Sequence, residues 1–96
     1  MYLLNAFSLQ MVDLPCSVRL TEVSKEDVFW NFELISAIGH ADTAAVLGVE
    51  CSRINVKLHI GETAFVAQLQ GGRLPEGSTT LPEGFSFKFI KVEILG

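Results

Sequence analysis

The sequence Phe85-Ser86-Phe87-Lys88-Phe89-Ile90-Lys91-Val92-Glu93-Ile94-Leu95 lies at the end of the chain and decides its fold. Apolar side chains alternate with polar ones, first at odd-numbered positions and then, from Ile90 on, at even-numbered positions. Alternation predicts a β-strand. The change of parity predicts either a β-bulge or a strand whose covered face changes along its length.

Four earlier segments predict the rest of the sheet. Residues 53–60 alternate most regularly, and the turn at Gly61-Glu62 predicts that they form a hairpin with residues 63–69. Residues 2–4 are apolar throughout, which predicts a short strand covered on both faces. Residues 17–23 alternate more weakly and are expected at the edge of the sheet.

Two short helices and one long loop complete the outline. Ser24 and Asp27 form a capping-box pattern, which predicts a helix over residues 25–32. A second helix is expected over residues 41–47, because Gly48 suits a left-handed C-terminal cap. Residues 36–40 break the pattern between the helices. Residues 71–84 hold four glycines and two prolines, which predicts an extended loop.

The order of these elements predicts an α+β fold. We expect a mixed sheet of about five strands flanked by helices, in a single compact domain over residues 1–96. The length excludes two separate cores. A hydrophobic content of 49% with 19% charged residues excludes a disordered chain.

Charge and cysteine content exclude further classes of protein. The net charge of −4 argues against a general duplex-DNA binder, which takes its affinity from neutralising phosphates. Cys16 and Cys51 are too few for a disulfide framework, so we expect reduced thiols in a cytoplasmic protein. We expect no membrane association, because the sequence has no signal-peptide pattern and no apolar run of the ~20 residues that a span needs.

His40 is the first candidate for chemistry. It follows Gly39 at the predicted start of a helix, where backbone N–H groups can bind an anion. A histidine at this position suits acid–base work on a phosphate. The plain alternative is a polar residue that begins a helix. His59 is distant in sequence and no carboxylates cluster nearby, so we expect no metal site.

Arg73 and Glu76 are the second candidates. Pro75 stiffens the loop between them, so that guanidinium and carboxylate could both face one phosphate. The alternative is a surface turn with an ion pair that contributes little. The same two interpretations apply to Arg53.

Three segments together resemble the viral ring nucleases, small proteins of archaeal viruses and phages that antagonise type III CRISPR immunity. The segments are Leu4-Asn5-Ala6-Phe7-Ser8, Ser36-Ala37-Ile38-Gly39-His40 and Arg73-Leu74-Pro75-Glu76-Gly77. The resemblance covers nearly the whole chain, including Arg53 and the last strand. Two features depart from it: the segment between His40 and Arg53 is shorter, and Ser52 stands where an asparagine commonly precedes the arginine.

The resemblance implies a homodimer that binds cyclic tetra-adenylate at its two-fold interface. It further implies cleavage without metal or cofactor, to linear di-adenylates that end in a 2′,3′-cyclic phosphate, in the cytoplasm of an infected host. His40 matches the catalytic histidine, while Arg73 and Glu76 match the active-site loop. The residues expected to hold the ligand are Asn5, Ser8, Gly39, Arg53 and Arg73.

Two other functions remain open from the sequence. A binding module of the same fold could sequester a cyclic nucleotide without cleaving it. A viral regulatory protein that binds ordinary nucleic acid would be marked by a steep salt dependence.

Overall fold

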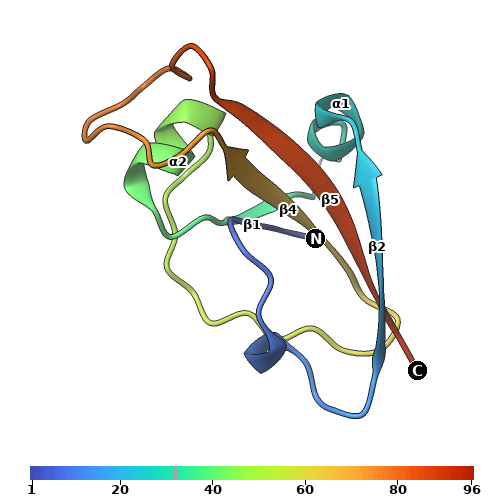
Figure 1. Cartoon of the computed structure of the whole chain (residues 1–96). Coiled ribbons are helices and arrows are strands. Elements are labelled where there is room, and N and C mark those ends of the chain that lie inside the picture. The colour runs from blue at the N-terminus through green and yellow to red at the C-terminus, as the bar shows by residue number, and fades with distance from the viewer. Residues whose placement is uncertain (32) are drawn as a thin grey trace.

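Five strands form one mixed sheet in the computed structural model, which describes residues 1–31 and 33–96 (Figure 1). The strands are β1 (Tyr2–Leu4), β2 (Ser17–Val23), β3 (Ile35–Ala37), β4 (Thr63–Gln70) and β5 (Ser86–Leu95). Their order across the sheet is β2-β5-β4-β1-β3. β1 runs parallel to β3 and β4, whereas β5 is antiparallel to β4 and β2. The predicted α+β class is confirmed, and β2 lies at the edge as expected.

The last strand, β5, changes its covered face along its length. Its registers with β2 and β4 run one residue against one residue from end to end, so neither ladder contains a bulge. Phe87 and Phe89 pack on one face of the sheet, while Val92 and Ile94 pack on the other. The change of parity in the sequence therefore reports two cores on opposite faces of one continuous strand.

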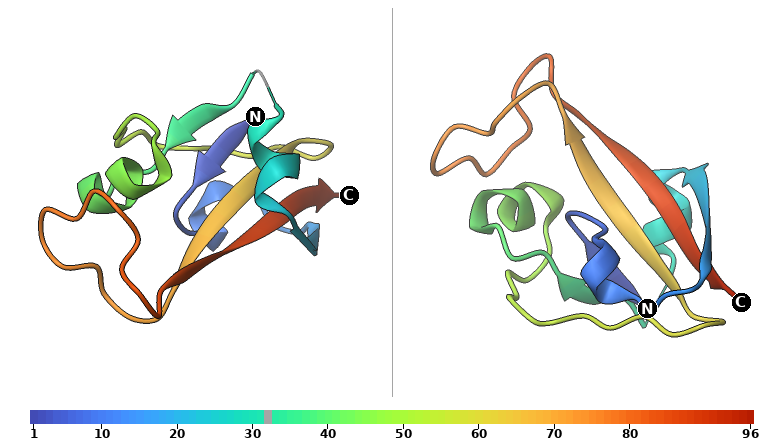
Figure 2. Two further views of the ribbon diagram at one scale, coloured as in Figure 1. Left: turned by 90° about the horizontal axis from the view of Figure 1, so that it is seen from above. Right: turned by 60° about the horizontal axis from the view of Figure 1, so that its bottom comes forward.

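Both α-helices cover the same face of the sheet (Figure 2). Val28 of α1 (Lys25–Phe29) and Ala44 of α2 (Ala41–Leu47) are buried against Leu3, Ile38 and Phe89. The Ser24–Asp27 capping box begins α1, and Gly48 at φ 74° ends α2, both as predicted. Helix α1 is shorter than the predicted span of 25–32. It ends at Phe29, and Phe32 lies outside the described residues.

An irregular layer covers the opposite face. It consists of the 3₁₀ turn η1 (Leu9–Met11) and the extended residues 53–60. The prediction that residues 53–60 form a strand is wrong, because they make only an isolated bridge between Leu58 and Val12. Val56 and Leu58 are buried against the sheet, whereas Ile54 and Ile60 stay exposed. The regular alternation thus reflects a segment lying across a sheet face, without a ladder to a neighbour.

Two further predictions about pairing need correction. β4 does not form a hairpin with residues 53–60, since it pairs with β1 and β5. β3 was not predicted, because its three residues fall where the sequence pattern breaks. Its position is set by tertiary contacts: the Ile35 N–H donates to the Met1 carbonyl at 2.8 Å, and the strand pairs with β1. A strand of three residues is too short to show an alternation of apolar and polar side chains, so the sequence could not predict it.

The loop over residues 71–84 connects β4 to β5 and lies beside α2 (Figure 2). It contains neither helix nor strand, as predicted. Among the described residues, no helix combines the length and apolar character needed to cross a membrane.

Candidate functional site

A pocket of about 260 Å³ forms where the end of β1, the start of α2, the end of β4 and the 71–84 loop meet. Its polar lining consists of Asn5, His40, Thr43, Gln68 and Arg73. Its apolar lining consists of Ala67, Leu69 and Leu74. Three residues predicted from separate parts of the sequence, Asn5, His40 and Arg73, therefore share one concave site.

His40 is the N-terminal cap of α2 and is exposed. Its Nδ1 accepts the backbone N–H of Thr43 at 3.4 Å and lies 3.4 Å from the Thr43 hydroxyl. In a neutral ring, accepting at Nδ1 places the proton on Nε2. In a charged ring, the Nδ1–H can instead donate to the hydroxyl. Thr43 can therefore hold the ring in either charge state and leaves Nε2 for a ligand.

Arg73 enters the pocket from the 71–84 loop. The next residue, Leu74, is only 6% exposed and fixes this part of the loop to the protein. Glu76 is exposed and does not line the pocket. The following N–H, that of Gly77, donates to Oδ1 of Asp42 on α2 at 3.1 Å. The loop thus carries both predicted residues but brings only Arg73 into the lining.

Arg53 and Gly39 form a unit next to the pocket. The Arg53 Nε donates to the Gly39 carbonyl at 2.9 Å. A Cβ on Gly39 would lie 3.1 Å from Cγ of Arg53, so the arginine stem would have to shift by a few tenths of an ångström to admit any larger residue. Arg53 does not line the pocket itself. Because Gly39 directly precedes His40 in the sequence, this hydrogen bond holds the Arg53 side chain beside the backbone next to His40.

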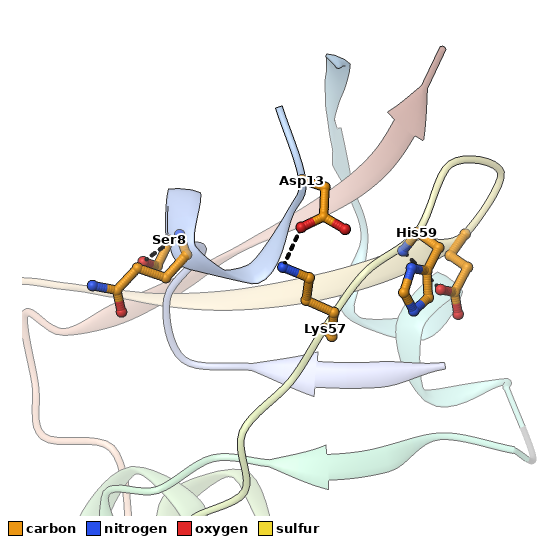
Figure 3. A network of polar contacts seen from close by, with 6 residues as sticks. Ser8, Asp13, Lys57 and His59 are labelled. Carbon is orange, nitrogen blue, oxygen red and sulfur yellow. Dashed lines mark hydrogen bonds and ion pairs between the residues drawn. The ribbon is translucent and has the colours of Figure 1, made fainter. Parts of the chain in front are cut away.

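Ser8 lies apart from these residues. Its hydroxyl accepts the Gln10 N–H at 3.3 Å and caps η1, and it lines a different pocket together with Lys57 (Figure 3). Near it, Lys57 Nζ lies 2.6 Å from Oδ1 of Asp13. The hydrogen bond and the charge of Lys57 lower the pKa of the Asp13 carboxyl. The structure does not bring Ser8 to the His40 pocket.

Three residues of the site were not predicted. Thr43 holds the His40 ring, Gln68 lines the pocket from β4, and Asp42 binds the loop. Gln68 gave a weak signal as a polar residue that follows the apolar run Ala64–Ala67 of β4. Thr43 and Asp42 gave none, since threonine and aspartate in a first helical turn are ordinary.

A larger cavity of about 440 Å³ opens at the β3 edge. Its lining includes Leu3, Ile35 and Glu50 and contains no arginine, lysine or histidine. It therefore lacks the cation that an anionic ligand needs, which favours the His40 pocket. In the described part of the chain, no three side chains of histidine, cysteine, aspartate or glutamate group closely enough to hold a metal ion.

Comparisons with known proteins place the chain among viral relatives. The model of the family described as STIV B116-like matches residues 1–89. Ten chains of solved structures match, and one is B116 of Sulfolobus turreted icosahedral virus. It aligns with a TM-score of 0.79 and 26% sequence identity over 96% of this chain and 97% of its own. Among curated proteins, none matches.

Proposed function

This chain belongs to the STIV B116-like family, and from that premise we propose that it is a viral ring nuclease acting in the cytoplasm of an infected host. It cleaves the second messenger cyclic tetra-adenylate without a metal ion and so antagonises type III CRISPR immunity. The proposal joins the family membership to the motifs shared with the viral ring nucleases.

The observation that carries the proposal is the convergence of three motifs on one pocket. Asn5, His40 and Arg73 come from segments far apart in sequence, yet all three line the same cavity. Arg53 stands beside it through its bond to the Gly39 carbonyl. A histidine with a free Nε2, an arginine and an amide suit a site that holds and cleaves a phosphodiester.

The chemistry needs little beyond orientation and charge stabilisation, because ribose carries its own nucleophile. The 2′-oxygen attacks the adjacent phosphorus and gives its proton to solvent water, and the bond from phosphorus to the 5′-oxygen breaks. Protonated His40 gives a proton to the departing 5′-oxygen through Nε2. Arg73 stabilises the negative charge that builds on the phosphoryl oxygens. Cleavage at two opposite linkages leaves two di-adenylates with 2′,3′-cyclic phosphate ends.

Glu76 has a supporting role in this scheme. It is exposed on the 71–84 loop outside the pocket lining. From the same loop it orients Arg73 or takes part in proton transfer once the ligand is bound.

The size of the pocket supports a homodimer as the active form. About 260 Å³ lies below the range of roughly 300–1,000 Å³ for pockets that enclose a drug-sized ligand. One copy of this pocket is therefore small for a ring of four nucleotides. A two-fold dimer supplies two copies of every group to a ligand that has rotational symmetry. Doubling Arg53 and Arg73 also gives a local positive field despite the net charge of −4.

The test is a cleavage assay in EDTA with cyclic tetra-adenylate, and in parallel with cyclic hexa-adenylate. We expect the tetra-adenylate to be converted to a di-adenylate with a cyclic phosphate end, identified by chromatography and mass. His40→Ala should lower turnover by about 10²–10⁴-fold and retain binding. His59→Ala is the matched control, because His59 is an exposed histidine outside this pocket.

Two other outcomes would assign a different function. A ligand that co-elutes unchanged with the protein would indicate a binding module that sequesters the messenger. No binding of either ring, together with salt-sensitive binding of ordinary DNA, would indicate a regulatory nucleic-acid-binding protein.

A further inference from the structure

We propose that Asp42 is a positioning residue, which holds the 71–84 loop against α2 so that Arg73 and Glu76 keep a fixed relation to His40. The expected effect of Asp42 on catalysis rests on the proposed function. The contact itself is the bond from the Gly77 N–H to Oδ1 of Asp42, at 3.1 Å.

This bond joins the two segments that carry the candidate catalytic residues. Asp42 lies two residues after His40, in the first turn of α2. Gly77 directly follows Glu76 and is 35 residues away from Asp42 in sequence. A single side chain therefore links the histidine cap to the loop that supplies the arginine and the carboxylate.

The loop has few other restraints. Its remaining hydrogen bonds among the described residues are local. The Ser78 N–H and hydroxyl both donate to the Pro75 carbonyl, and the N–H of Phe85, just after the loop, donates to the Pro82 carbonyl. For the part of the chain that the structure describes, Asp42 makes the one hydrogen bond from the loop to a segment distant in sequence. Burial of Leu74 is the second restraint.

The local conformation of the loop is suited to this bond. Residues 75–78 form a turn closed by Ser78, so they move as a unit. Gly77 has φ +80°, a conformation that other residues rarely adopt, and its N–H donates to Asp42 outside the turn. The Asp42 bond then fixes the whole turn, and Glu76 with it, to the helix.

The property that matters is an oxygen acceptor, not a negative charge. A carboxylate near a phosphate site weakens anion binding, so charge alone would be unfavourable. Asp42→Asn keeps an oxygen at the same distance from the backbone, whereas Asp42→Ala removes it. The two substitutions therefore separate positioning from charge.

The first test measures the loop and does not depend on activity. Trypsin can cut after Arg73, which is exposed and is followed by Leu74. We expect Asp42→Ala to raise the rate of this cut roughly fivefold, as for losing one exposed bond to a carboxylate. Asp42→Asn should stay close to the natural protein. Glu83→Ala, at an exposed carboxylate of the same loop, should leave the rate unchanged.

The second test measures turnover of cyclic tetra-adenylate. Asp42→Ala should lower kcat about fivefold with little change in KM, and Asp42→Asn should restore it. The melting temperature is recorded for each variant to separate this effect from unfolding. If Asp42→Ala folds poorly, Gly77→Ala is used instead, because it perturbs the same hydrogen bond at its donor residue in the loop. Its Cβ would meet nothing within 4 Å, but its φ would be strained.

Equal cutting at Arg73 in Asp42→Ala and the natural protein would overturn the inference, whatever the activity. An Asp42→Asn variant as impaired as Asp42→Ala would also overturn it, because charge would then be responsible. A natural protein that cleaves neither ring overturns the proposed function. In that case faster cutting in Asp42→Ala would still support the contact between loop and helix.

Discussion

Two polar regions of this protein have similar residues but differ in how their charges are satisfied. One is the His40 pocket, with Arg73 from the 71–84 loop. The other lies on the irregular layer, where Asp13, Lys57 and His59 are close together (Figure 3). In the second region Lys57 pairs with Asp13, and the backbone N–H of His59 donates to Oε1 of Glu62 at 2.7 Å. Among the described residues, no carboxylate lies within ion-pair distance of Arg73.

The difference separates a candidate binding site from a charged surface. A histidine and a cation occur in both regions, so composition does not distinguish them. The cation of the second region already has its counter-ion, whereas the cation of the first faces a cavity. An anionic ligand can complete the first region but must compete with Asp13 in the second.

The largest expected effect comes from removing the cation of each region in turn. Arg73→Ala should lower turnover of cyclic tetra-adenylate by about 10²-fold, the typical cost of losing one group that stabilises a developing negative charge. Lys57→Ala should leave turnover within about twofold, because surface ion pairs contribute little. Steady-state kinetics in EDTA measure both.

Arg73→Lys sharpens this comparison. Lysine keeps the charge but loses the planar, two-pronged hydrogen-bonding geometry of guanidinium. Turnover between that of the natural protein and that of Arg73→Ala would indicate bidentate contact with a phosphate. Equal losses in Arg73→Ala and Lys57→Ala would contradict the distinction between the two regions.

The second region should instead matter for stability. Leu58 is 2% exposed and packs the irregular layer onto the sheet. Leu58→Ala should lower the free energy of unfolding by about 2–4 kcal/mol, measured by urea denaturation. Turnover per folded molecule should not change. Ile60→Ala is the control: Ile60 is 64% exposed in the same segment and should cost less than about 0.5 kcal/mol.

The same segment shows where sequence patterns predict structure and where they do not. Alternation placed Ile54, Val56, Leu58 and Ile60 on one face, and of these Val56 and Leu58 are buried while Ile54 and Ile60 are exposed. It could not tell a strand in the sheet from an extended chain lying across the sheet, because in both successive side chains point to opposite sides. β3 illustrates the opposite case, since it is in the sheet through contacts with β1 and has no pattern of its own.

The candidate site follows a similar rule. Segments with a strong local signal were found: the glycine-rich loop, and the cap at His40. The family resemblance added Asn5, which lines the pocket, and Ser8, which does not. Thr43 and Asp42 could not be found, because their roles depend on which groups the fold places opposite them.

The smallest expected effect concerns pH and the Asp13–Lys57 pair. Lys57 lowers the pKa of Asp13 in the folded protein, whereas in the unfolded chain the carboxyl titrates near its ordinary value of about 3.9. Below that value the unfolded state binds more protons, so the free energy of unfolding falls as the pH drops through the folded pKa. The stabilisation is fully present above the unfolded pKa. Urea denaturation from pH 2 to pH 6 should therefore show a steeper acid loss in the natural protein than in Asp13→Asn.

Lys57→Gln should remove the same pH dependence, because the shift originates in the lysine, and added salt should weaken it in the natural protein. Since both side chains are largely exposed, the effect should remain smaller than that of Leu58→Ala. A loss of stability in Asp13→Asn that matched Leu58→Ala, or that persisted in high salt, would mean that the pair holds the irregular layer in place. The Asp13–Lys57 pair would then contribute to the stability of the fold. The two regions would differ only in that the His40 region forms a pocket.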